Sequence, residues 1–176
     1  MKARLLLLAA LCGCALLPAS AARAASSGAS TLNLASSASA FINVLDNTFT
    51  LTPTAADYNN DYVEATGASG LRMQVKTNST TGMVLYVRCT DAAPQIALAD
   101  LLVKTQTAPG PGGTSLTTYT AVSPLDRALW STGAAQGPFL QVNMDVRIKN
   151  LFAYPDPINA GTTTYTDNLT FTVIAQ

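Results

Sequence analysis

Histidine, the commonest general base and transition-metal ligand, is missing from all 176 residues of the chain. Its absence removes the Ser-His-Asp and Cys-His arrangements of nucleophilic catalysis. The sequence also lacks the motifs GxSxG, HExxH and GxxxxGK[ST]. Glu64 is the only glutamate, and the aspartates mostly fall in sequences typical of turns. We therefore expect a protein that is not an enzyme and that needs no cofactor.

One acidic stretch, DYNNDYVE, resembles the first half of a calcium-binding loop because Asp57, Asn59 and Asp61 are spaced two residues apart. The match ends there, since Tyr62 replaces the turn glycine and Ala68 stands where the closing glutamate belongs. Two interpretations remain, an irregular Ca²⁺ site or a solvated turn built by Asp and Asn. We favour the turn, because these side chains readily bond their own backbone.

Three aromatic residues are candidates for a flat platform that stacks against a sugar ring: Trp130, Tyr58 and Tyr62. The same residues would also suit a hydrophobic core. For Trp130, next to Leu129, the core is favoured because a buried indole removes a large apolar area from water. The alternative function that these residues and the acidic stretch suggest is a carbohydrate-binding or calcium-assisted adhesive module.

The first 24 residues have the order of a secretory signal peptide: two basic residues, an apolar run from Leu5 to Leu17, and the small-residue site Ala22-Arg23-Ala24 before Ala25. The apolar run is too short for a permanent membrane span. The sequence therefore predicts an exported protein, periplasmic, at the cell surface or extracellular. A minor alternative is a lipoprotein anchored through Cys14.

Removal of this segment takes away three basic residues and leaves seven basic and ten acidic ones, a net charge of −3. No basic stripe remains, so nucleic acid is not an expected partner. Cys12 and Cys14 leave with the segment, and Cys89 alone cannot form an intramolecular disulfide. Because Cys89 alternates with Leu85 and Val87, we expect a buried, unreactive thiol, and the alternative is an intermolecular disulfide.

The remaining sequence indicates an all-β fold. Residues 25–40 form a flexible Ala/Ser-rich segment, and residues 41–176 form one domain. In residues 139–150, apolar and polar residues alternate five times, which predicts a strand with one dry and one wet face. Residues 71–77 alternate likewise, 78–82 form a turn cluster and 83–89 are the returning strand, which together predict a hairpin. Shorter strands are expected within 95–105 and 115–122, and loops at 108–113 and 154–161.

Short strands separated by turn signals favour an immunoglobulin-like antiparallel β-sandwich that follows a cleaved signal peptide. The final segment, INAGTTTYTDNLTFTVIAQ, resembles the last strand of bacterial secreted fimbrial and spore-coat-U-like β-sandwich subunits. The residues that carry the match are Ala160, Gly161, Tyr165, Asp167, Leu169, Phe171 and Val173. The chain differs from such subunits in one respect, because they usually hold a disulfide-forming cysteine pair that the processed chain lacks.

The resemblance implies an exported structural or surface-interaction protein, pilin-like or coat-like. Its partners would be copies of itself or other surface subunits, joined when the N-terminal extension of one subunit adds a strand to the next. Leu32 and Leu34 are the candidate donor-strand residues. A second interpretation, which we favour from the sequence, is that residues 31–34 pair within their own sheet. No transmembrane segment is expected after processing, and glycans are the alternative partners.

Overall fold

The longest strand, β8 (Gln136–Lys149), forms where the sequence alternates most regularly. The structure, a computed structural model, describes residues 34–46, 48–155 and 164–176. Along one side β8 pairs with β3 (Leu71–Thr77) and then with β2 (Tyr62–Ala65), and along the other side it pairs with β5 (Leu101–Thr105). β1 (Ala40–Val44) and β6 (Thr120–Ala121) complete this six-stranded sheet in the order β1-β3-β8-β5-β6, with β2 attached to β8.

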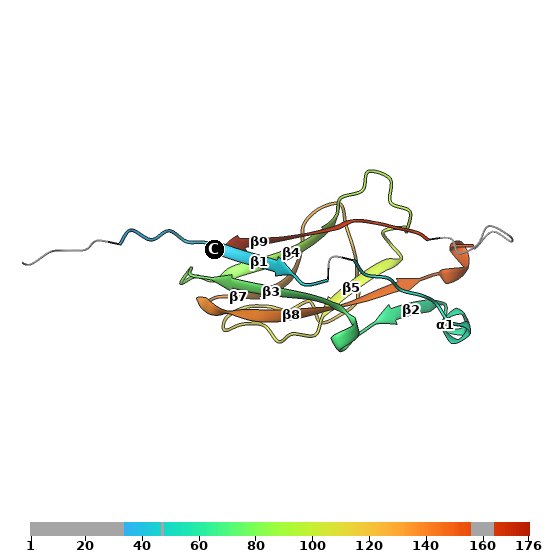
Figure 1. Cartoon of the computed structure of the whole chain (residues 1–176), viewed down its shortest axis with the longest axis horizontal. Helices are drawn as coiled ribbons and strands as arrows, with labels where there is room; N and C mark the ends of the chain where they lie inside the picture. Colours follow the sequence, from blue (N-terminus) through green and yellow to red (C-terminus); the bar gives the residue numbers. More distant parts are fainter. Residues whose placement is uncertain (1–33, 47, 156–163) are drawn as a thin grey trace, which may run out of the picture. The chain divides into compact units, whose positions relative to one another are not determined.

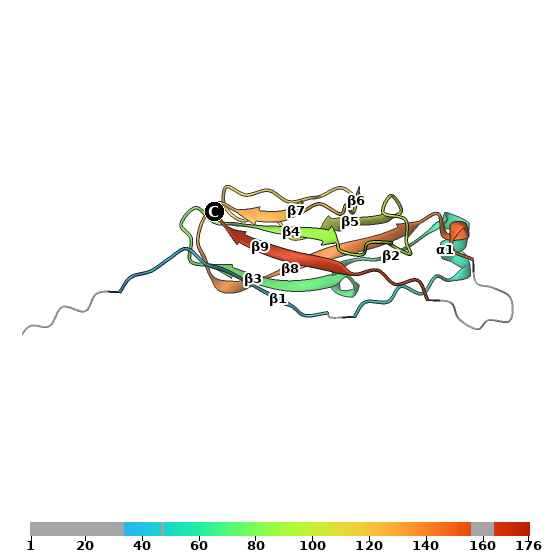
Figure 2. The same cartoon turned by 90° about the horizontal axis from the view of Figure 1, so that it is seen from above.

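A second, three-stranded sheet has the order β7-β4-β9. Its strands are β7 (Arg127–Thr132), β4 (Met83–Cys89) and β9 (Leu169–Ala175). Every pairing in both sheets is antiparallel. In Figure 1 the two sheets overlap in projection, so β4 and β9 are drawn among strands of the larger sheet. Figure 2 shows the same elements from above.

Side chains from the two sheets fill the space between them. The largest fully buried apolar ones are Trp130, Met73, Met83, Leu85, Leu129, Met144, Val75, Val87, Val103 and Val142. Burial of each contributes on the order of 1.5–3 kcal/mol. Strands make up 43% and helices 9% of the described residues, which confirms the all-β class and the two antiparallel layers.

The helical segments are short. They are α1 (Ala55–Asn60), η1 (Gly67–Ser69) and η2 (Leu151–Ala153). The sequence predicted strands at 71–77 and 83–89, and both are confirmed as β3 and β4. The hairpin between them is wrong, because β3 lies in the larger sheet and β4 in the smaller one. Residues 78–82 thus carry the chain from one layer to the other.

Side-chain hydrogen bonds explain this crossing. Asn78 accepts a bond from Ser39 N at 2.6 Å and donates one to Ser37 O at 2.8 Å, which holds the end of β3 against the start of β1. Gly82, with φ +91°, then enters β4 where a Cβ would collide with the Thr132 carbonyl of β7. Only glycine fits this backbone conformation at so close an approach.

Other sequence expectations were partly confirmed. Within 95–105 only Leu101–Thr105 is a strand, and within 115–122 only Thr120–Ala121 is one, next to an isolated bridge from Ser115 to Trp130. β7 had no sequence prediction. The predicted signal peptide 1–24, Cys14 and Leu32 lie outside the described residues, as do most of the loop 154–161 and two of the resemblance residues, Ala160 and Gly161.

Candidate functional site

The calcium candidates do not converge. Residue 57 lies in helix α1, and in a helix residues two apart point to opposite sides, so Asp57 and Asn59 diverge. The carboxylate of Asp57 accepts bonds from Thr54 N and Thr54 Oγ1, both at 2.7 Å, and these bonds lower the pKa of Asp57. Asp61 follows the helix in a left-handed conformation. The segment is thus a helix with a capping box, in which the three candidate side chains are not gathered around one point.

The aromatic candidates separate into buried and exposed residues. Trp130 is 1% exposed, and its indole N–H donates to Ala108 O at 2.7 Å, so it belongs to the core and cannot stack against a sugar. Tyr58 is 36% exposed and lies 5.5 Å, centroid to centroid, from the ring of Phe152, which is 75% exposed. Tyr62 is half-buried, and the Cζ atom of the Arg147 guanidinium lies 4.3 Å from the centroid of its ring. Of the predicted platform, only Tyr58 keeps an accessible aromatic face.

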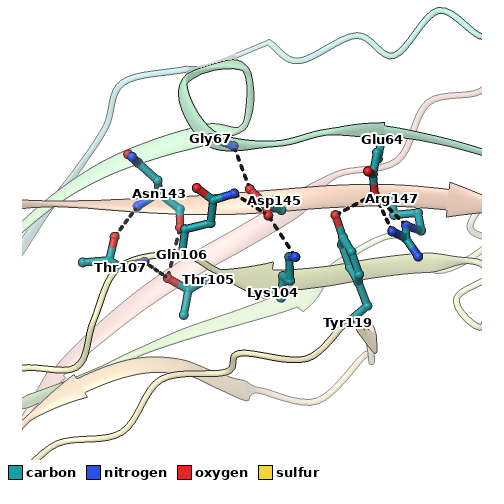
Figure 3. A network of polar contacts seen from close by, with 10 residues as sticks. All are labelled: Glu64, Gly67, Lys104, Thr105, Gln106, Thr107, Tyr119, Asn143, Asp145 and Arg147. Carbon is teal, nitrogen blue, oxygen red and sulfur yellow. Dashed lines mark hydrogen bonds and ion pairs between the residues drawn. The ribbon is translucent and has the colours of Figure 1, made fainter.

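A buried carboxylate stands on the outer face of β8, where the sequence predicted a wet row. Asp145 is 0% exposed, so that expectation is wrong at this position. Its oxygens accept bonds from Gly67 N at 2.9 Å and Gln106 Nε2 at 2.8 Å, and Lys104 Nζ lies 3.4 Å away (Figure 3). Buried charges persist where such donors replace water. The turn at η1 covers this part of the sheet.

Two glycines let that turn approach the sheet. Gly67 has φ +60°, a conformation that L side chains rarely adopt. At Gly70 a Cβ would collide with the Met144 carbonyl of β8. The amide of Gly67 can therefore reach Asp145, although nothing in the local sequence around either residue indicates the contact.

A second polar cluster lies farther along the same face (Figure 3). Glu64 and Arg147 are directly opposite each other on β2 and β8, and Glu64 Oε2 accepts bonds from Arg147 Nε at 2.8 Å and Nη2 at 2.6 Å. Tyr119 O–H donates to the same oxygen at 3.0 Å, and the guanidinium lies 4.0 Å from its ring centroid. Burial, together with the bond to Glu64, raises the pKa of Tyr119 above its ordinary value.

These contacts connect separate segments of the larger sheet. Each carboxylate, Asp145 and Glu64, is paired with a cation, Lys104 and Arg147, and each also accepts bonds from other protein groups. Sequence reasoning missed the network because its members come from four separate segments. The one available signal was Asp145 itself, an acidic residue in the middle of an otherwise regular strand.

The edges of the two sheets provide a different kind of site. In β9, Asn168 O accepts a bond from Thr90 N, and Gln176 N donates to Gly82 O, so the even-numbered residues face β4. In an antiparallel strand the intervening residues point their backbone groups the other way. Four residues of β9 therefore direct N–H and C=O groups to its open edge: Leu169, Phe171, Val173 and Ala175.

β1 has the complementary arrangement. Ser39 O accepts from Asn78 N and Leu45 N donates to Arg72 O, so the odd-numbered residues face β3. The backbone groups of Ala40, Ile42 and Val44 therefore point to the open edge of β1.

The two open edges lie beside each other (Figure 1). In the described part of the chain no strand pairing links them. The side chains of six residues at these edges pack against the core but are only partly buried: Ala40, Ile42, Val44, Leu169, Phe171 and Val173. Each open edge therefore offers unpaired backbone groups beside an apolar surface, which are the features that an added strand uses.

The remaining predicted residues fall as follows. Cys89 is 2% exposed and free, which confirms the expected buried thiol. Leu34 is 91% exposed and lies outside any strand. Across the described ranges no helix is long and apolar enough to cross a bilayer, and no group of three or more Asp, Glu, Cys or His residues is placed to hold a metal.

No protein-family model, curated protein or solved structure that we compared with the chain matches it.

Proposed function

We propose that the chain is an exported, non-enzymatic structural subunit with an immunoglobulin-like sandwich, which assembles by accepting a strand from another copy. The observation that carries this proposal is the pair of neighbouring open edges on β1 and β9. A strand added to one of these open edges would bond its backbone groups and cover the partly buried side chains beside it.

The occupant that we propose is the Ala/Ser-rich segment before β1, residues 25–35, with Leu32 and Leu34 as its apolar anchors. The two leucines are two residues apart, so in an extended strand both point to the same face. The small, uncharged residues around them impose little desolvation cost. The resemblance of the C-terminal strand to fimbrial and coat subunits supports the same mode of assembly, as does the predicted signal peptide.

The test compares the chain beginning at Ala25 with the chain beginning at Ser36, both sized by light scattering. We expect the longer protein to associate and the shorter one to remain monomeric. Addition of a synthetic peptide of residues 25–36 to the shorter protein should slow amide exchange at Leu169, Phe171 and Val173. Monomers in both cases, with no change in exchange, would refute the proposal.

A second candidate function is glycan binding through the exposed aromatic pair Tyr58 and Phe152. Such a platform would stack against the apolar face of a sugar ring. A glycan array probed with the native chain and with Tyr58→Ala would test it, and binding that is equal in the two proteins would exclude this platform.

A further inference from the structure

An exposed aromatic row crosses one end of the larger sheet. Phe41 of β1 is directly opposite Lys76 of β3, and directly opposite residues in an antiparallel pair project to the same face. The Nζ atom of Lys76 lies 5.3 Å from the ring centroid of Phe41 and 4.4 Å from that of Phe139 on β8. Phe41 is 54% exposed and Phe139 is 47% exposed. Their strand neighbours Ile42 and Val75 pack into the core, so the row lies on the outer face of the sheet.

A cluster of side-chain amides lies beside this row. Asn43, Gln74 and Gln141 are directly opposite one another across β1, β3 and β8. Each is two residues away from its aromatic-row neighbour in the same strand, so it shares the outer face at a spacing of roughly 7 Å. Asn143 follows on β8 and completes the amide cluster, and long side chains reach across such a spacing.

The amides use only part of their hydrogen-bonding capacity. Asn43 Nδ2 donates to Gln74 Oε1 at 3.4 Å, and Gln141 Nε2 donates to Asn143 Oδ1 at 2.8 Å. Within the described residues, the other amide atom of each of these side chains makes no hydrogen bond. The cluster therefore keeps two donor groups and two acceptor oxygens for a ligand. Hydroxyl groups suit it, because one hydroxyl both donates and accepts.

Lys76 adds one positive charge to this surface. Across the described ranges it takes part in no ion pair, whereas Arg72, farther along the same face of β3, is neutralised by Asp46 at 2.8 Å. Apolar ring surface, unsatisfied amides and a cation thus lie next to one another. A uronic acid sugar complements all three, because it has an apolar C–H face, several hydroxyls and a carboxylate.

We propose that this outer face of β1, β3 and β8 binds acidic glycans that contain uronic acids. A sugar ring packs against Phe41 or Phe139, its hydroxyls bond to the amide cluster, and its carboxylate pairs with Lys76. An acidic peptide would satisfy the lysine but would leave the amides without hydroxyl partners. The inference does not depend on the proposed strand addition, which uses the backbone edge of β1 and not the side chains on its outer face.

The test is isothermal titration calorimetry of the chain beginning at Ala25 with trigalacturonate, whose methyl ester is the uncharged control. We expect saturable binding in the millimolar range, and about two- to fivefold weaker binding of the ester, because an exposed ion pair contributes modestly. The chain beginning at Ser36 lacks the proposed donor segment and should bind equally, so this result is separate from the outcome for strand addition. No binding of trigalacturonate, or equal affinity for its ester, would overturn the proposal. Equal affinity for the peptide triglutamate would overturn the glycan class.

Aromatic variants locate the site. Phe139→Ala changes an exposed residue and should weaken the binding of trigalacturonate by about two- to tenfold. Phe152→Ala is the matched control, because Phe152 is 75% exposed but lies in η2, and its loss should leave the affinity unchanged. The reverse result would assign the glycan to the aromatic pair of Tyr58 and Phe152 and would overturn the site on the outer face.

Polar variants test the charge and the amides. Lys76→Gln should remove the preference for the acid over its ester. Lys149→Gln removes the same charge from the far end of β8, roughly 30 Å away, and should keep that preference. Gln141→Glu places a negative charge in the amide cluster at an exposed position and should weaken binding at least about threefold. Full affinity in Gln141→Glu would contradict the proposed location.

Discussion

The backbone amide of Gly67 donates a hydrogen bond to the carboxylate of Asp145 over 2.9 Å, although 78 residues separate them in the sequence. This contact joins the turn at η1 to the middle of β8. Together with Gln106 and Lys104 it surrounds an acidic side chain that alternation alone would place in water. The carboxylate therefore ties three segments of the larger sheet together.

Asp145→Asn should destabilise the protein substantially. The substitution removes the charge that faces Lys104 and turns an N–H₂ group toward donors, at a cost of about 2–4 kcal/mol. The measurement is the urea unfolding midpoint. Asp126→Asn is the matched control, because Asp126 pairs with Arg88 over 3.7 Å at the surface and its loss should cost less than about 1 kcal/mol. Equal losses of stability in the two variants would contradict the expectation that the buried contacts of Asp145 stabilise the protein more than the surface pair of Asp126.

Tyrosine ionisation should lower stability at alkaline pH. Burial and the bond to Asp100 raise the pKa of Tyr154 to about 12, and burial with the bond to Glu64 raises the pKa of Tyr119 as well. Unfolded tyrosines lose their protons near pH 10, so above about pH 10 the folded state holds more protons than the unfolded state. Stability is then complete below that pH and falls as the pH rises through these raised values.

An ultraviolet titration of tyrosinate in the folded protein measures this directly. Tyr154→Phe and Tyr119→Phe should each remove one late-ionising step from this titration. A high-pH part of the titration that neither substitution changes would contradict the raised pKa values of Tyr154 and Tyr119.

The thiol of Cys89 should react slowly with Ellman's reagent in the native protein and rapidly in denaturant, because the side chain is 2% exposed within the core. The chain beginning at Ala25 is suitable, since Cys89 is then its only cysteine. Cys89→Ala should retain most of the stability, whereas Cys89→Ser buries a hydroxyl among apolar groups and should cost about 1–3 kcal/mol. Rapid native labelling would mean that the strand end at Cys89 opens readily.

Sequence patterns predicted which residues of a strand face the core, but not which strands become neighbours. In β3 the alternation is regular, and the core faces of β3 and β4 were both predicted correctly. Their expected hairpin was wrong because the partner of a strand depends on distant residues. Here Asn78 bonds to Ser37 and Ser39, which lie 41 and 39 positions before it in the sequence.

The same dependence on distant residues explains which features of the candidate sites were predicted and which were not. Trp130 was recognised as a core residue from its size, and Cys89 from its alternation with apolar neighbours. The buried position of Asp145 depends on a turn far away in the sequence, and the open edges depend on the order of strands in two sheets. Local periodicity contains neither kind of information.

Proline substitutions in β9 should distinguish the two sides of that strand. Proline has no N–H, so at Val173 it removes a donor from the open edge, and at Thr172 it removes one that faces β4. Thr172→Pro should therefore lower the unfolding free energy by about 1–3 kcal/mol through the lost ladder bond. Val173→Pro should keep that ladder and instead reduce self-association, measured by light scattering. Val173→Ala is the control for the lost side chain, because it keeps the N–H and should still associate. If Val173→Pro associates as strongly as Val173→Ala, the partner strand does not bond to β9 at this position, and β1 alone would have to provide the edge.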